Sequence, residues 1–229
     1  MNAPASLEQA RFNMIEQQIR PWDVLDKSIL DLLSVVRREE FVPLAHKALA
    51  FFDMQIPLVE GADEAMRQGQ SMLEPKVEAR LLQDLHVLPH DKVLEVGTGS
   101  GYMAALLAHR AQRVITMEID PGLARTAREN LQRAGVTNVE VREGDGSKGL
   151  PAEAPFDVIV LSGSVPEVPQ ALLSQLKVGG RLAAIVGFEP VMRATIVTRT
   201  GEASFTTAQP WDTVAPRLAH FPEPSRFHF

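Results

Sequence analysis

The stretch VLEVGTGSGYMAALLA, residues 93–108, decides the fold. An apolar, strand-like run ends in three glycines at alternate positions, Gly97, Gly99 and Gly101, and passes into helix-forming residues. Glycine lets the backbone turn tightly and approach a ligand with no Cβ in between. Open α/β sheets bind ligands where such a turn follows the carboxyl end of a strand. The stretch therefore predicts a nucleotide-like ligand over the glycines, with a plain strand-to-helix turn as the alternative.

From Asp91 onward the chain alternates between strand-like and helix-like segments. Asp120 and Pro121 suit the start of a helix and Gly135 its end. Gly179-Gly180 is expected to form a turn. Strands are expected over residues 92–96, 114–118, 139–142, 156–161, 181–186 and 191–198, and helices over 101–109, 121–131 and 169–176. This alternation predicts an α/β fold with a doubly wound, mostly parallel sheet.

The first 85 residues have a mainly helical pattern, interrupted by a loop-rich stretch with an acidic middle. Apolar residues at helical spacing mark three expected buried faces: Leu7, Phe12, Ile15 and Ile19; then Ile29, Leu32, Leu33 and Val36; then Val77, Leu81, Leu82 and Leu85 after Pro75. We expect a single domain over 1–229. It would consist of a helical region (1–85), a binding core (86–200) and an extended C-terminal segment (201–229) packed against the body.

Composition limits the possible functions. The chain has 229 residues, 45% of them apolar, so a sizeable core is possible. The net charge of −6 argues against a nucleic-acid partner, and the lack of cysteine excludes disulfides and thiol chemistry. No secretory signal and no apolar run of the ~20 residues that a membrane span needs is found. The expectation is a soluble, cytoplasmic protein with no membrane partner and no metal site.

The spacing of the glycine turn narrows the ligand. A dinucleotide site requires G-x-G-x-x-G, but Tyr102 occupies the third position here. Glu118 ends the second strand, roughly 20 positions after the first glycine, where a carboxylate can accept both ribose hydroxyls. Asp145 follows the third strand and could accept from an adenine amine. The alternatives are a solvated acid for Glu118 and an Asp-Gly turn for Asp145. The pattern favours a nucleoside without a pyrophosphate.

Four motifs resemble, in order and spacing, those of class I S-adenosylmethionine (SAM) methyltransferases: VLEVGTGSGY (93–102), TMEID (116–120), EGDG (143–146) and LKVGGRL (176–182). REEFVP (38–43), GQSMLEP (69–75) and PFDVIVLSGSVPEVP (155–169) extend the likeness over most of the chain. Together they resemble the protein-L-isoaspartate O-methyltransferase family. The resemblance implies a Rossmann-like class I methyltransferase fold with an N-terminal helical segment.

The resemblance also implies the site and its chemistry. SAM, with S-adenosyl-L-homocysteine as product, would be bound by Glu95, Gly97, Thr98, Gly99, Ser100, Gly101, Glu118, Ile119, Asp145 and Gly146. The methyl acceptor would be the carboxylate of an isoaspartyl residue in a damaged protein or peptide, bound by Gln70, Ser71 and Ser162. A carboxylate with a pKa of about 4 is already ionised at neutral pH, so no general base is required. Catalysis would then consist mostly of positioning two bound reactants. The expected assembly is a monomer or a homodimer.

The acceptor loop departs from the family. The family sequence is close to Gly-Gln-Thr-Ile-Ser-Gln-Pro, whereas residues 69–75 read GQSMLEP. Ser71 keeps the first hydroxyl and is a catalytic candidate, but Leu73 occupies the position of the family's active-site serine. Leucine cannot donate a hydrogen bond to a carboxylate. The preceding segment, VEGADEAMRQ (59–68), is longer and more acidic, and an acidic rim would repel an anionic peptide.

Three interpretations follow from these departures. The chain could be a diverged isoaspartyl enzyme whose hydrogen-bond donors are Ser71, Ser162, Ser164 or backbone amides. It could instead keep the SAM site and methylate another acceptor, such as a small acid or a phenol, with Lys76 or Arg67 pairing the acid. The third interpretation is a non-catalytic SAM-binding protein. The first is the favoured prediction.

Overall fold

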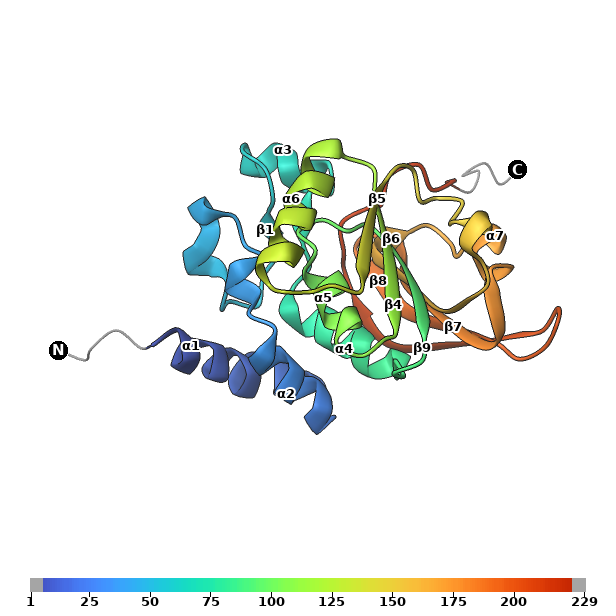
Figure 1. Cartoon of the computed structure of the whole chain (residues 1–229), viewed down its shortest axis with the longest axis horizontal. Coiled ribbons are helices and arrows are strands. Elements are labelled where there is room, and N and C mark those ends of the chain that lie inside the picture. Colours follow the sequence, from blue (N-terminus) through green and yellow to red (C-terminus); the bar gives the residue numbers. More distant parts are fainter. Residues whose placement is uncertain (1–5, 224–229) are drawn as a thin grey trace.

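A seven-stranded sheet forms the centre of the computed structural model, which describes residues 6–223 (Figure 1). The strand order is β5-β4-β3-β6-β7-β8-β9. The strands β5, β4, β3, β6 and β7 run parallel to one another. Strand β8 pairs antiparallel with β7, and β9 pairs antiparallel with β8. The strands are β3 (Lys92–Val96), β4 (Arg113–Glu118), β5 (Val139–Glu143), β6 (Phe156–Val165), β7 (Leu176–Phe188), β8 (Val191–Arg199) and β9 (Phe205–Thr213).

Helices cover both faces of the sheet, and each face has its own apolar core. In β3, Val93 belongs to one core and Leu94 to the other, because successive side chains of a strand point to opposite faces. The first core includes α4 (Pro75–Leu85) and α5 (Tyr102–Ala108). The second includes α7 (Gln170–Leu173), while α6 (Pro121–Arg133) packs beside β4 and β5. The predicted fold class is confirmed: a doubly wound, mostly parallel sheet with a helical N-terminal segment.

The N-terminal region packs on the α4 side of the sheet (Figure 1). Its helices are α1 (Leu7–Met14), α2 (Lys27–Val35) and α3 (Ala62–Arg67), joined by a π turn (Ile15–Ile19) and 3-10 turns at Arg20–Trp22, Arg38–Glu40 and Leu44–Leu49; a further 3-10 turn, Pro151–Glu153, lies in the sheet region. Two short strands, β1 (Ile56–Pro57) and β2 (Ser71–Met72), pair antiparallel. The predicted faces of α2 and α4 are buried.

The predicted face of the first helix was half wrong. Ile15 and Ile19 are buried, but Leu7 and Phe12 are 62% and 58% exposed. A π turn has more residues per turn than an α-helix, so one 3.6-residue stripe does not continue across residue 15. Arg11 is buried in place of Phe12 and pairs with Glu39.

Two further predictions are corrected by β7. The helix before it ends at Leu173, short of residue 176, and Gly179-Gly180 lie inside the strand and form no turn. A Cβ on Gly180 would lie 2.9 Å from the carbonyl oxygen of Lys177 in β7 and 3.0 Å from that of Asp157 on β6. Glycine is therefore present because two backbones approach closely, at the place where the pairing of β6 and β7 shifts register.

The C-terminal segment contains a strand that the sequence did not indicate. Residues 205–213 form β9 on the sheet edge, and Pro210 is compatible with an edge strand. Beyond β9 the chain makes an isolated parallel bridge between Arg217 and Ser164 of β6, and Ser164 exchanges hydrogen bonds with it: Ser164 N donates to Pro216 O (2.6 Å) and Leu218 N donates to Ser164 O (2.9 Å). The segment thereby returns toward the carboxyl ends of the parallel strands. The rest of the predicted tail, residues 224–229, lies outside the described residues.

Candidate functional site

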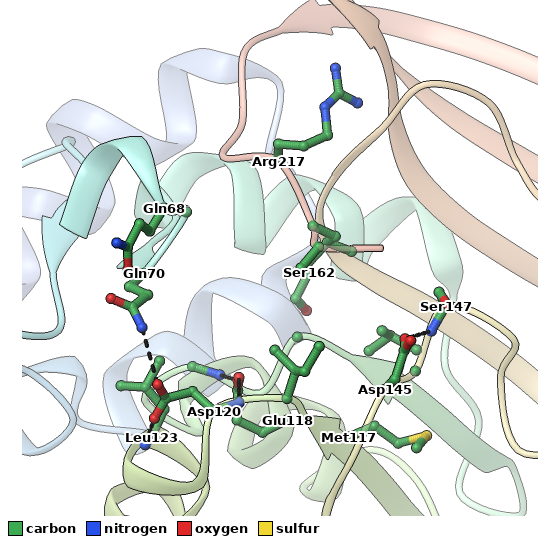
Figure 2. A pocket seen from close by; sticks show the side chains of 18 of the residues that line it. Gln68, Gln70, Met117, Glu118, Asp120, Leu123, Asp145, Ser147, Ser162 and Arg217 are labelled. Atoms are coloured by element: carbon green, nitrogen blue, oxygen red, sulfur yellow. Dashed lines mark hydrogen bonds between the residues drawn. The ribbon is translucent and has the colours of Figure 1, made fainter. Parts of the chain in front are cut away.

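A cavity of about 270 Å³ lies beyond the carboxyl ends of β3, β4 and β5 and beside Ser162 of β6 (Figure 2). The chain runs outward from β3 to β5 and then returns to the other side of β3 as β6, so the cavity sits where the strand order reverses. Its walls are Leu58, Gln68, Gly69, Gln70, Ser71, Val96, Gly97, Gly99, Met117, Glu118, Ile119, Asp120, Pro121, Leu123, Gly144, Asp145, Gly146, Ser147, Ser162, Arg217, Leu218, Ala219 and Phe221.

The glycine turn forms one wall through Gly97 and Gly99. Both have positive φ, 94° and 53°, a conformation that side chains disfavour. A Cβ on Gly97 would lie 2.8 Å from Cδ2 of Leu218, so glycine leaves room here that any other residue would fill. Gly101, at φ 85°, is outside the lining, and a Cβ there would meet Leu131 and Ala127 of α6. Glycine at position 101 thus allows α6 to pack closely behind the turn.

Two other predicted cofactor residues shape the turn from behind. The hydroxyl oxygens of Thr98 and Thr116 are 2.6 Å apart and hydrogen-bonded. The Ser100 carbonyl accepts from Nδ2 of Asn130 at 2.9 Å. Both Thr98 and Ser100 are buried and neither lines the cavity. Their side-chain and backbone hydrogen bonds can hold the turn in place.

Glu118 lies directly beside the glycine turn. Its Oε2 accepts from the Gly99 amide at 2.8 Å and its Oε1 from the Asp120 amide at 3.0 Å (Figure 2). Burial raises the pKa of Glu118, and these backbone hydrogen bonds oppose that shift. A carboxylate has about four acceptor positions, so two remain for a ligand's hydroxyls. Ile119, next in the chain, is exposed and adds an apolar surface to the same wall.

Asp145 faces the cavity from the loop after β5. Its Oδ1 accepts from the Ser147 amide at 2.8 Å, which is the local turn foreseen as the alternative role. Its Oδ2 lies 3.0 Å from Nδ1 of His220. Burial raises the pKa of Asp145, but the hydrogen bonds from Ser147 and the contact with His220 outweigh it, and the pKa lies below its usual value. The carboxylate is thus ionised and available as an acceptor, with Gly146 beside it.

Glu95 lies beneath the cavity, inside the sheet. It accepts from the hydroxyls of Ser162 and Thr116, each at 2.7 Å. Burial raises its pKa to about 7, although both hydrogen bonds lower it. Because Ser162 directs its proton to Glu95, its oxygen faces the cavity as a hydrogen-bond acceptor. Glu95 is therefore positioned to orient Ser162 from below, and it does not line the cavity itself.

The predicted acceptor residues divide between the cavity wall and the core. Gln70 and Ser71 line the cavity, and Gln70 donates from Nε2 to Oδ2 of Asp120 at 3.2 Å. The Ser71 hydroxyl oxygen is buried and has no hydrogen-bond partner. Leu73 is only 4% exposed, belongs to the core on the α4 side and is outside the lining. The structure therefore brings Gln70, Ser71 and Ser162 to one cavity and turns the Leu73 side chain away from it.

The comparisons with known proteins agree with this geometry. The family model described as protein-L-isoaspartate(D-aspartate) O-methyltransferase matches residues 9–214. A protein-L-isoaspartate O-methyltransferase of Methanoculleus marisnigri is 45% identical over 177 residues, 77% of each chain. One of Koribacter versatilis is 41% identical over 194 residues, covering 85% of this chain and 82% of that one. The chain belongs to the protein-L-isoaspartate(D-aspartate) O-methyltransferase family.

Solved structures extend the match in fold. A protein-L-isoaspartate O-methyltransferase superposes with a TM-score of 0.74 at 24% identity, covering 91% of this chain and 65% of that one. A Plasmodium falciparum structure in complex with S-adenosyl-L-homocysteine also gives a TM-score of 0.74, at 17% identity, covering 90% and 98%. The family predicted from the sequence is confirmed, and with it a SAM-dependent methyltransferase. Within residues 6–223, no helix is long and apolar enough to span a membrane.

The cavity of this family member has the features that SAM requires. Backbone without side chains at Gly97 and Gly99 leaves space for the ligand, and the carboxylates of Glu118 and Asp145 provide acceptors for hydroxyl and amine groups. Within the described part of the chain, the wall contains three acidic residues, Glu118, Asp120 and Asp145, and no lysine, which suits a nucleoside whose only anionic group is a distant carboxylate. The residues present therefore fit SAM.

Sequence reasoning missed one whole wall of this methyltransferase site. Arg217, Leu218, Ala219 and Phe221 line the cavity from the C-terminal segment. Arg217 Nη2 donates to the Gly187 carbonyl at 2.7 Å, and its guanidinium lies over the ring of Phe188. The aromatic, proline-rich tail was the only available indication. Nothing in its spacing tells which strand end it crosses.

Proposed function

We propose that this chain transfers the methyl group of SAM to the free carboxylate of isoaspartyl residues in damaged proteins and peptides. The observation that carries the proposal is the single cavity shared by the two halves of the site. Gly97, Gly99 and Glu118 line it on the donor side, and Gln70 and Ser71 line it on the acceptor side. A cavity of this kind brings two reactants together, which is most of what the reaction requires.

On the donor side we propose that Glu118 accepts the ribose hydroxyls and Asp145 the adenine amine. SAM supplies an electrophilic methyl group on a sulfonium. The contact between His220 and Asp145 would then have to loosen or share the Asp145 carboxylate with the ligand. His220 is well placed for this because its side chain is 62% exposed and free to turn outward.

On the acceptor side, the substrate carboxylate needs hydrogen-bond donors and no general base, since it is ionised at neutral pH. Ser71 is the candidate donor, because its buried hydroxyl lacks a partner and a buried polar group is costly until it is paired. Ser162 donates its hydroxyl proton to Glu95, so its oxygen is left to accept a hydrogen bond from a donor group of the substrate. The Leu73 side chain has no hydrogen-bond donor, so backbone amides would supply the remaining hydrogen bonds to the substrate carboxylate.

The test is methyl transfer from labelled SAM to an isoaspartyl peptide, with the same peptide containing normal aspartate as the control. We expect labelled methyl ester in the isoaspartyl peptide alone. No transfer above the control, with S-adenosyl-L-homocysteine binding intact, would reject isoaspartyl residues as acceptor. A small acid or phenol acceptor, or SAM binding without turnover, would then be the alternative, and family membership makes both less favoured. A cytoplasmic location and the oligomeric state remain predictions.

A further inference from the structure

Arg38 is a fully buried arginine that reaches the acceptor loop from behind. Its side chain is 0% exposed. Nη2 donates to the carbonyl oxygen of Leu73 at 2.8 Å, and Nη1 donates to that of Ala50 at 3.1 Å. One planar guanidinium therefore joins two loops that are far apart in the sequence. Arginine suits this role because its donors form a rigid fork, which a lysine ammonium does not provide.

Two other groups pack beside Arg38, whose buried Nε has no hydrogen-bond partner within residues 6–223. Its Nε lies 3.9 Å from Oε2 of Glu78 on α4. Its guanidinium carbon lies 5.8 Å from the ring centroid of Tyr102, and that ring also packs on Phe41. Tyr102 is the first residue of α5 and directly follows the glycine turn. Arg38 thus packs against the Tyr102 ring, whereas both of its hydrogen bonds end on carbonyls outside the glycine turn, those of Leu73 and Ala50.

The acceptor loop is otherwise attached through short backbone contacts, among them the hydrogen bond from the Leu58 amide to the Gln70 carbonyl at 2.9 Å. β1 and β2 pair over only two residue pairs, Ile56 with Met72 and Pro57 with Ser71. Burying a charged guanidinium costs free energy, and a buried ion pair often adds little stability in return. A buried arginine whose hydrogen bonds end on loop carbonyls is therefore better explained by the loop conformation that it fixes than by the stability of the core.

We propose that Arg38 is a positioning residue for the acceptor: it fixes the Leu73 carbonyl and so holds Gln70 and Ser71 at the cavity wall. The inference rests on the proposed function to the extent that residues 69–73 are the acceptor loop. In this arrangement position 73, where the family has a serine, contributes its backbone carbonyl and not its side chain. The side chain of Leu73 anchors in the core while its carbonyl is held by Arg38.

The test compares Arg38→Lys with Arg11→Lys. Arg11 is a matched control because it is also buried and ion-paired, with Glu39, and none of its hydrogen bonds or ion pairs in residues 6–223 reaches the acceptor loop. We expect Arg38→Lys to lower kcat/KM for the isoaspartyl peptide at least about tenfold, the effect of losing a charged hydrogen bond. The Kd for S-adenosyl-L-homocysteine should stay within about twofold of wild type. Arg11→Lys should lose thermal stability and keep kcat/KM.

Hydrogen exchange of the loop provides a readout that needs no turnover. Amides of residues 69–74 should exchange faster in Arg38→Lys than in Arg11→Lys, while residues 97–101 stay unchanged. Equal loop exchange and equal kcat/KM in the two variants would overturn the proposal. If the wild type does not methylate the peptide, the proposed function fails, yet the exchange comparison still decides the role of Arg38.

Arg38→Met is the second variant for this test, to be used if Arg38→Lys does not fold. Burial raises the pKa of Glu78 to about 8, although Arg38 lowers it, so this carboxyl is largely protonated at neutral pH. Removing the arginine charge then leaves no buried anion without a partner. The same faster exchange over 69–74 is expected in this variant, and wild-type protection of the loop would count against the proposal.

Discussion

The donor half and the acceptor half of the cavity are built in different ways. The donor half lies on the ends of adjacent parallel strands, where the Gly97 amide is bonded to Met117 and the Gly99 amide to Glu118. The acceptor half lies on a loop that is tied to the body by a two-residue strand pair, by the hydrogen bonds of Gln70 with Leu58 and Asp120, and by Arg38. Strand ends give a rigid site for the common cofactor, whereas loops are where specificity varies.

The largest expected effect is on the acceptor half. Leu73→Ser should lower the free energy of unfolding by about 3 kcal/mol, because it leaves a cavity and an unpaired hydroxyl in the core. Urea unfolding measures this change. We expect no gain in kcat/KM for the isoaspartyl peptide, since position 73 points away from the cavity. A gain above tenfold would mean that the side chain turns toward the substrate and that the loop is less fixed than its contacts indicate.

The next effect concerns the donor half. Gly97→Ala should weaken S-adenosyl-L-homocysteine binding about a hundredfold, roughly 2.7 kcal/mol, because the added Cβ meets Leu218 and the backbone has positive φ. Gly135→Ala is the control: Gly135 also has positive φ, but a Cβ there meets nothing within 4 Å. Titration calorimetry of both variants distinguishes lost space from backbone strain. Equal losses in the two would remove the steric explanation.

A pH comparison probes the buried support of the acceptor loop. The pKa of Glu78 is raised by burial from 4.5 to about 8, so the folded protein keeps a proton that the unfolded chain releases. Stability must therefore fall as pH rises through this window. Glu78→Gln lacks this proton, and its free energy of unfolding should fall by about 1–2 kcal/mol less than that of wild type between about pH 6 and pH 8. Glu95, with a pKa raised to about 7, titrates in both wild type and Glu78→Gln. Both proteins therefore share the loss of stability that Glu95 causes as pH rises. Parallel pH curves would show that Glu78 is ionised in the fold.

The smallest effect returns to the donor half. Glu118→Ala should weaken S-adenosyl-L-homocysteine binding at least about tenfold, roughly 1.4 kcal/mol, through the lost carboxylate acceptors. Glu143→Ala is the matched control, because Glu143 ends the neighbouring strand, is exposed and does not line the cavity. Unchanged affinity in Glu118→Ala would take this carboxylate out of the donor site.

Most of the parallel sheet could be predicted from the sequence, and its edges could not. β3, β4 and β6 are buried on both faces and appear as short apolar runs between helical patterns. β9 is mostly exposed and contains Pro210, so its pattern lacks the apolar alternation that marks a strand. In β7, the pair Gly179-Gly180 has the local composition of a turn, but the two residues lie in a bulge of the strand, where Gly180 packs against the backbone of β6.

The sequence by itself predicted which residues gather at the proposed donor end of the site. The glycines, Glu118 and Asp145 follow consecutive strands, and a parallel sheet necessarily brings the ends of such strands together. The tertiary structure alone decided what faces them: Leu218 over Gly97, Ser162 bonded to Glu95, and Arg38 on the carbonyl of Leu73. The physical reason is that local spacing encodes which face of an element is buried. It does not encode which distant loop will lie across that element once the chain has closed around its core.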